Sequence, residues 1–135
     1  MPKPPVLAEL TWIDALRFDV TSARITTVLD GDANAGASPV QMLVIGLAGC
    51  MSADLVDIIR KGRHPLTALH SSIVAQRAPD PPTRVVSAQL RFEIRGDVPP
   101  AAVERAIALS RDKYCSVWHS LRQDIQLTTS FDITV

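Results

Sequence analysis

SPVQMLVIGLAGCMSADLVDIIRKGR, residues 38–63, is the stretch that decides how this chain folds. Ser38 followed by Pro39, with Gln41 three positions after the serine, is typical of a helix N-cap, a proline at the first helical position and a capping box. Basic residues and then a glycine mark the end of the apolar pattern after Lys61. The stretch therefore predicts one long helix from Pro39 to Lys61.

The first half of this helix is apolar nearly all round, so we expect it inside the molecule or in an interface. Its small residues would let another backbone approach closely. They are Gly46, Ala48, Gly49, Ser52 and Ala53. The apolar run Val40–Met51 is too short, and too soon followed by Asp54 and Asp57, to cross ~30 Å of hydrocarbon. We therefore expect no insertion into a membrane.

Alternating apolar and polar residues predict strands on both sides of the helix. The pattern is strongest in Val85–Arg95 and returns in Ile125–Ile133, so we expect two half-exposed antiparallel strands there. Leu66–Arg77 is another candidate. Less regular runs precede the helix, at Leu7–Ile13, Leu16–Ser22 and Arg24–Leu29.

A second helix should begin near Pro99 and Pro100 and should either continue or break and restart around Lys113 to Cys115. Its apolar residues recur at helical spacing. Together these elements predict an α+β fold. With 135 residues, 47% of them hydrophobic, the chain can form one domain, residues 1–135, with a core that needs no metal or disulfide.

Charge and cysteine content narrow the classes of function. The 14 basic and 14 acidic residues balance, so nothing draws the chain toward nucleic acid or an anionic membrane. The first ten residues, MPKPPVLAEL, lack the apolar run of a secretory signal, so we expect a cytoplasmic protein. In that reducing compartment Cys50 and Cys115 are either buried small hydrophobes or reactive thiols.

Two segments resemble the OsmC/Ohr-like family (osmotically inducible protein C and organic hydroperoxide resistance protein). Residues 38–63 are similar to that family's central helix, with a Ser-Pro entry and Ala-Gly-Cys ending at Cys50. The segment VERAIALSRDKYCSVWHSL, Val103–Leu121, resembles its second cysteine segment, including the Lys-Tyr-Cys-x-Val core around Cys115. The resemblance implies curved antiparallel sheets around two central helices, in an intertwined homodimer with active sites near the subunit interface.

The resemblance also implies a thiol peroxidase that acts on organic hydroperoxides. Cys50 would attack the peroxide as a thiolate and become a sulfenic acid. Cys115 would condense with it to a disulfide, which a small dithiol or a dithiol protein would reduce again. A thiolate is the reactive form, and a resolving thiol stops oxidation at a reversible stage. No cofactor is expected.

A cation is needed beside Cys50, because the cysteine lies several turns inside its helix and the helix dipole acts only near the ends. By resemblance this cation is an arginine of the N-terminal strands, for which Arg17 is the first candidate and Arg24 the second. Characterised peroxidases support the arginine with a glutamate, but here Val40 stands at that position and the uncharged Gln41 follows it. This departure favours a rival function, a small-molecule-binding or thiol redox-sensing protein.

Large apolar side chains could line a pocket for a hydroperoxide tail, although such side chains more often belong to the core. The candidates are Trp12, Phe18, Met42, Met51 and Trp118. Cys115 and His119 would share a helix face and could bind a metal together with Cys50. No Cys-x-x-Cys or His-x-x-x-His pair supports such a site, so we expect no metal.

Overall fold

The computed structural model describes residues 2–135 and divides into two compact units. The N-terminal unit ends at Leu43, and the C-terminal unit is Val44–Val135. The expectation of one domain over residues 1–135 stays a prediction.

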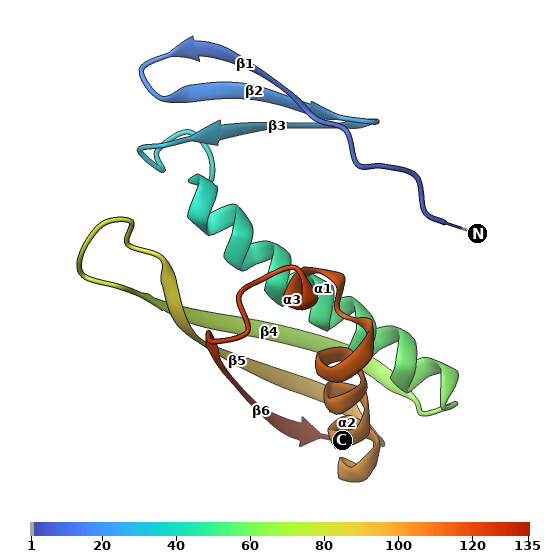
Figure 1. Cartoon of the computed structure of the whole chain (residues 1–135). Helices are drawn as coiled ribbons and strands as arrows, with labels where there is room; N and C mark the ends of the chain where they lie inside the picture. The colour runs from blue at the N-terminus through green and yellow to red at the C-terminus, as the bar shows by residue number, and fades with distance from the viewer. Residues whose placement is uncertain (1) are drawn as a thin grey trace. The chain divides into compact units, whose positions relative to one another are not determined.

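The N-terminal unit is a three-stranded antiparallel sheet in the order β1-β2-β3 (Figure 1). Its strands are β1 (Glu9–Asp14), β2 (Arg17–Ser22) and β3 (Ile25–Asp30). The turns between them place Ala15 and Ala23 at φ values of 44° and 51°, in the left-handed region that tight reversals use. All three strands were predicted, with ends that shift by one or two residues.

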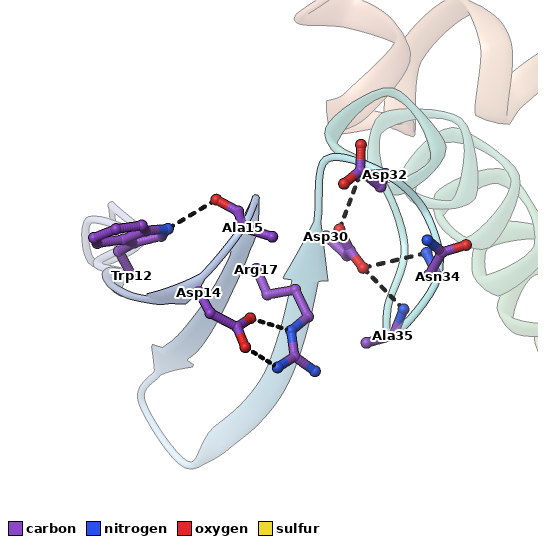
Figure 2. A network of polar contacts seen from close by, with 8 residues as sticks. All are labelled: Trp12, Asp14, Ala15, Arg17, Asp30, Asp32, Asn34 and Ala35. Atoms are coloured by element: carbon purple, nitrogen blue, oxygen red, sulfur yellow. Dashed lines mark hydrogen bonds and ion pairs between the residues drawn. The ribbon is translucent and has the colours of Figure 1, made fainter.

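Asp30 organises the loop that follows β3. Its side chain is buried, and its carboxylate accepts backbone hydrogen bonds from Asp32, Asn34 and Ala35 at 2.9, 3.2 and 2.9 Å (Figure 2). These N–H groups, Ala35 first, lower the pKa of Asp30 below its ordinary value. The loop is therefore held by one ionised carboxylate.

The long helix α1 (Pro39–Lys61) begins with the capping box that the sequence predicts. The backbone N–H of Ser38 donates to Gln41 Oε1 at 2.9 Å, and the N–H of Gln41 donates to Ser38 Oγ at 3.1 Å. Two of the free N–H groups at the helix start are thus satisfied reciprocally. The helix ends on a basic last turn, also as predicted.

The C-terminal unit contains a three-stranded sheet in the order β4-β5-β6 (Figure 1). Its strands are β4 (Leu66–Arg77), β5 (Val85–Gly96) and β6 (Gln126–Thr134). β4 pairs with β5 antiparallel, but β6 pairs with β5 in parallel. The prediction of an antiparallel C-terminal strand was wrong, because the helical segment between β5 and β6 is a crossover that returns the chain in its original direction.

One hydrophobic core joins this sheet to its helices. Alternate residues of β5 face α1 and α2 (Pro100–Leu109), while the residues between them are exposed, as the alternation predicted. The stripe that α1 contributes recurs every four residues, which is one face of a helix. Its members are Leu47, Met51, Leu55 and Ile59. The chain therefore has an α+β fold, with helices on one face of the sheet.

By length and composition alone, α1 could cross a membrane. It has 23 residues and a window with mean hydropathy 1.9, although 22% of that window is buried in the protein. The core helix of a globular protein meets the same criterion, and the buried stripe from Leu47 to Ile59 is what such a helix requires. The expectation of no membrane contact stays a prediction.

Candidate functional site

Cys50 lies on α1 beside its buried stripe. The side chain is partly exposed and packs against the core next to Met51. Asp54, four residues later, occupies the same face one turn further along and is also partly buried. The helix thus presents a thiol and a carboxylate side by side, at the edge of the core, on residues that are partly exposed.

Cys115 lies where the second helical segment breaks. After α2 the helix widens into a π-helical turn, η1 (Ser110–Tyr114), and a short helix, α3 (Ser116–His119), follows the cysteine. Cys115 itself is extended, with ψ of 100°, and its thiol is completely buried. Its Sγ accepts a hydrogen bond from the backbone N–H of Trp118 at 3.3 Å. The sequence left open whether the helix continues, and the structure shows that it breaks.

The fold brings the two predicted cysteines together, although they are distant in sequence. Cys50 Sγ, Cys115 Sγ and a carboxylate oxygen of Asp54 all lie within 4.8 Å of one another. Both cysteines are free thiols here. A disulfide, whose bond length is ~2.05 Å, requires the two sulfur atoms to approach further. The arrangement can therefore support thiol-disulfide chemistry.

Burial raises the pKa of the Cys115 thiol to about 11. The hydrogen bond from the Trp118 N–H lowers it, whereas Cys50 and the negative charge of Asp54 raise it further. Cys115 is therefore protonated at neutral pH, and in this form it is a weak nucleophile.

Asp54 and Ser110 belong to the site, and the sequence reading missed both. Ser110 is completely buried in the π-helical turn, and its Oγ donates to Asp54 Oδ2 at 2.7 Å. The helical spacing of Asp54 from Cys50 could have shown that they share a face. Ser110 gave no such signal, because its place depends on a π turn that periodicity does not predict.

Arg17, the predicted activating cation, lies in the N-terminal unit and is bound to Asp14. Its Nε and Nη2 donate to the two carboxylate oxygens of Asp14 at 2.5 and 2.6 Å (Figure 2). The guanidinium lowers the pKa of Asp14, and the carboxylate raises the pKa of Arg17. Arg17 is thus held in a bidentate ion pair, a geometry that fixes the orientation of its charge.

Two predicted pocket residues also belong to the N-terminal sheet. Trp12 and Phe18 are cross-strand partners of β1 and β2. Trp12 is 65% exposed, and its indole N–H donates to the carbonyl of Ala15 at 2.9 Å (Figure 2). An exposed tryptophan of this kind is available for an apolar contact, and its role in substrate binding stays a prediction.

The other predicted pocket residues lie on helices. Met42 is partly buried in the first turn of α1. Met51 and Trp118 are buried in the core of the C-terminal unit, at 0% and 4% exposure. Trp118 adjoins the site through the hydrogen bond from its backbone N–H to Cys115 Sγ. The Cζ atom of Arg111 lies over the Trp118 ring, 5.6 Å from the ring centroid, as in a cation–π contact. A role for any of the three in substrate binding stays a prediction.

Comparisons with known proteins agree with this architecture. The family model described as OsmC-like protein matches residues 30–130. Protein YhfA of Escherichia coli (strain K12) is 33% identical over 129 residues, which cover 93% of this chain and 96% of YhfA.

Two solved structures show the same fold. A hypothetical protein from Aquifex aeolicus VF5 gives a TM-score of 0.90 at 20% identity, with 98% of each chain covered. A protein from Legionella pneumophila, described as an organic hydroperoxide resistance protein OsmC and predicted redox protein, gives 0.73 at 14% identity. The match covers 98% of this chain and 99% of the Legionella protein.

Proposed function

Because the chain belongs to the OsmC-like family, we propose that it is a thiol-dependent peroxidase that reduces organic hydroperoxides. The main support for the proposal is the proximity of two free thiols, because Cys50 Sγ and Cys115 Sγ lie within 4.8 Å of each other. Structural relatives described as organic hydroperoxide resistance proteins support the choice of substrate class.

Burial assigns a different role to each cysteine. Cys50 is partly exposed, so a hydroperoxide can reach its sulfur, whereas Cys115 is completely buried. A buried thiol with a raised pKa is a poor first nucleophile but is protected from direct oxidation. Cys50 is therefore the peroxidatic cysteine of the proposal, and Cys115 is the resolving one.

The proposed reaction has three steps. The Cys50 thiolate attacks the terminal peroxide oxygen, the O–O bond breaks, and the alkoxide leaves as an alcohol after taking a proton. The Cys115 sulfur then bonds to the sulfur of the Cys50 sulfenic acid, and the hydroxide leaves as water with the proton of the Cys115 thiol. A small dithiol or a dithiol protein reduces the resulting disulfide and becomes a disulfide itself.

Arg17 is the proposed cation that stabilises the Cys50 thiolate. In characterised peroxidases a glutamate near the start of the central helix supports this arginine, and Val40 stands there in this chain. The bidentate ion pair with Asp14 supplies a carboxylate from the arginine's own sheet. We propose that Asp14 takes over the supporting role.

The working form is proposed to be a cytoplasmic homodimer. Two observations on α1 support self-association. Ile45 is 60% exposed, and a Cβ added at Gly46 or Gly49 would meet no atom within 4 Å, so the chain leaves this surface open. Exposed apolar side chains beside small residues are typical of helix surfaces that pack on another subunit.

One observation favours a second candidate function, a thiol redox sensor. The Asp54 carboxylate lies beside both sulfurs, and its negative charge contributes to the raised pKa of the Cys115 thiol. Slow reaction of a thiol that remains protonated suits a sensor, which is oxidised once and then acts in its oxidised form. The two functions differ in turnover.

Turnover in metal-free buffer is therefore the test. Reduced protein is mixed with an excess of an alkyl hydroperoxide and a dithiol, and peroxide consumption is followed. A peroxidase consumes many equivalents per chain, and Cys50→Ser abolishes this consumption. If the wild-type protein consumes one equivalent of peroxide and then stops, the redox-sensor function is favoured over the peroxidase. If the wild-type protein reacts with the hydroperoxide no faster than free cysteine does, the proposed peroxidase activity is contradicted.

A further inference from the structure

The cluster of Cys50, Asp54 and Cys115 brings one partly buried carboxylate against two free thiols. Among residues 2–135 no lysine, arginine or histidine forms an ion pair with Asp54. The nearest carboxylate along the helix, Asp57, differs in this respect because it is paired with Lys61 at 2.9 Å. If the two thiols lose their protons, the cluster carries additional negative charge that a bound cation would compensate.

The donor set is the kind that a thiophilic divalent cation selects. Cysteine sulfur binds Zn²⁺ at ~2.3 Å and carboxylate oxygen at ~2.0–2.2 Å, so two sulfurs of a tetrahedral site lie roughly 3.8 Å apart. The three donor atoms are already within 4.8 Å of one another. Little movement is therefore needed to bring them to bonding distance around one ion.

The surrounding hydrogen bonds orient the donor atoms. Ser110 donates to Asp54 Oδ2, and the N–H of Trp118 donates to Cys115 Sγ. Groups that bind metals are usually held by such outer contacts, which fix the ligand and keep its charge available. Ser110 is completely buried, so water does not compete for the hydrogen bond between its hydroxyl and Asp54.

We propose that Cys50, Asp54 and Cys115 form a binding site for a thiophilic divalent cation such as Zn²⁺, with a water molecule as the fourth ligand. Binding displaces the protons of the two thiols into solvent, and the ion forms two bonds to sulfur and one to a carboxylate oxygen. No oxidation or reduction is involved. The sequence analysis expected no metal and considered His119 as the third ligand, but His119 is exposed and lies outside the cluster, and Asp54 takes its place.

The site would link metal binding to thiol chemistry. With both sulfurs bound to the ion, Cys50 cannot attack a peroxide and Cys115 cannot form a disulfide. The bound metal therefore protects the thiols, and a Cys50–Cys115 disulfide formed in metal-free protein prevents metal binding. The proposal does not depend on peroxidase activity, because a sensor or a binding protein with these three residues would hold the ion equally well.

Titration with Co²⁺ under anaerobic conditions tests the proposal directly. Reduced, metal-free protein should bind one Co²⁺ per chain and develop the intense near-ultraviolet absorption of cobalt-thiolate bonds, which Zn²⁺ then displaces. Protein whose thiols have been alkylated is the control for binding by surface histidines, and it should show no such absorption. Wild-type protein without thiolate-to-cobalt absorption would overturn the proposal.

Two variants then test the third ligand. Asp54→Asn should weaken Co²⁺ binding by more than about 100-fold, because loss of a ligand exceeds the roughly 10–100-fold effect of an outer contact. Asp57→Asn is the matched control on the same helix and should bind as the wild type does. Equal affinity for Asp54→Asn and wild type, with circular dichroism showing the same fold, would remove Asp54 from the site.

Ser110→Ala covers the case in which Asp54→Asn does not fold. It should weaken Co²⁺ binding by roughly tenfold or more, since Asp54 loses the contact that orients it. Wild-type affinity in a folded Ser110→Ala protein would contradict the proposed arrangement of the carboxylate.

Discussion

Ser110 donates a hydrogen bond of 2.7 Å to Asp54 and thereby ties the turn before Cys115 to the turn of α1 that follows Cys50. Removing the hydroxyl leaves a partly buried carboxylate oxygen of Asp54 without its partner. Ser110→Ala should therefore lower the free energy of unfolding by about 1–3 kcal/mol. Urea unfolding of reduced, metal-free protein measures this. Ser116→Ala, at an exposed position of α3, should change stability by less than about 0.5 kcal/mol.

Gly49→Leu should disturb assembly without disturbing the fold of the chain. A Cβ added at Gly49 meets no atom within 4 Å outside the adjacent helix backbone, and leucine favours the helix more than glycine does. If α1 packs on a second subunit there, overpacking of about 1–3 kcal/mol should weaken self-association by roughly tenfold or more. Sedimentation velocity measures this, with Glu104→Leu on α2 as the exposed control. A dimer of unchanged affinity would place the interface elsewhere.

Acid should loosen the loop that Asp30 holds. Because backbone N–H groups depress its pKa in the folded chain, the ionised carboxylate stabilises the fold above the ordinary carboxyl range. That contribution is lost as the pH falls through the depressed value. Asp30→Asn should therefore lower the thermal midpoint at pH 7, and the difference from wild type should shrink in acid. Asp32→Asn, at an exposed position, should show no comparable trend.

Arg17→Ala should slow the oxidation of Cys50 by an alkyl hydroperoxide by on the order of tenfold or more. Each 1.36 kcal/mol of lost thiolate or transition-state stabilisation is a factor of ten in rate. Stopped-flow measurement of the second-order rate constant, with hydrogen peroxide as comparison substrate, tests this. Arg24→Ala, the change at the second candidate, is measured in parallel and should react at the wild-type rate. A wild-type rate in folded Arg17→Ala would instead make Arg24 the next candidate.

Local signals in the sequence predicted most of the fold. The capping box at Ser38 and Gln41 and the alternation in β5 depend on neighbouring residues only, so both could be recognised and both were confirmed. The parallel pairing of β6 could not, because an alternating strand has the same pattern whichever way its neighbour runs. Direction is set by the crossover between the strands.

In the candidate site, too, the features that depend on local sequence could be predicted and those that depend on tertiary packing could not. The meeting of Cys50 and Cys115 was expected only through family resemblance, since residues so distant in sequence are joined by tertiary packing. Asp54 was detectable from its helical spacing, whereas the contribution of Ser110 depends on the π-helical turn η1. The ion pair that holds Arg17 spans a tight turn and was not anticipated.

The pairing of Cys50 with Cys115 is tested by intact-mass analysis after addition of one equivalent of an alkyl hydroperoxide to reduced, metal-free protein. The wild-type chain should lose two hydrogens through a Cys50–Cys115 disulfide, located by peptide mapping. Cys115→Ser should gain oxygen at Cys50 instead and, in excess peroxide, continue to the sulfinic acid. Wild-type protein that shows neither change in excess peroxide would contradict the assignment of these two cysteines as a redox pair.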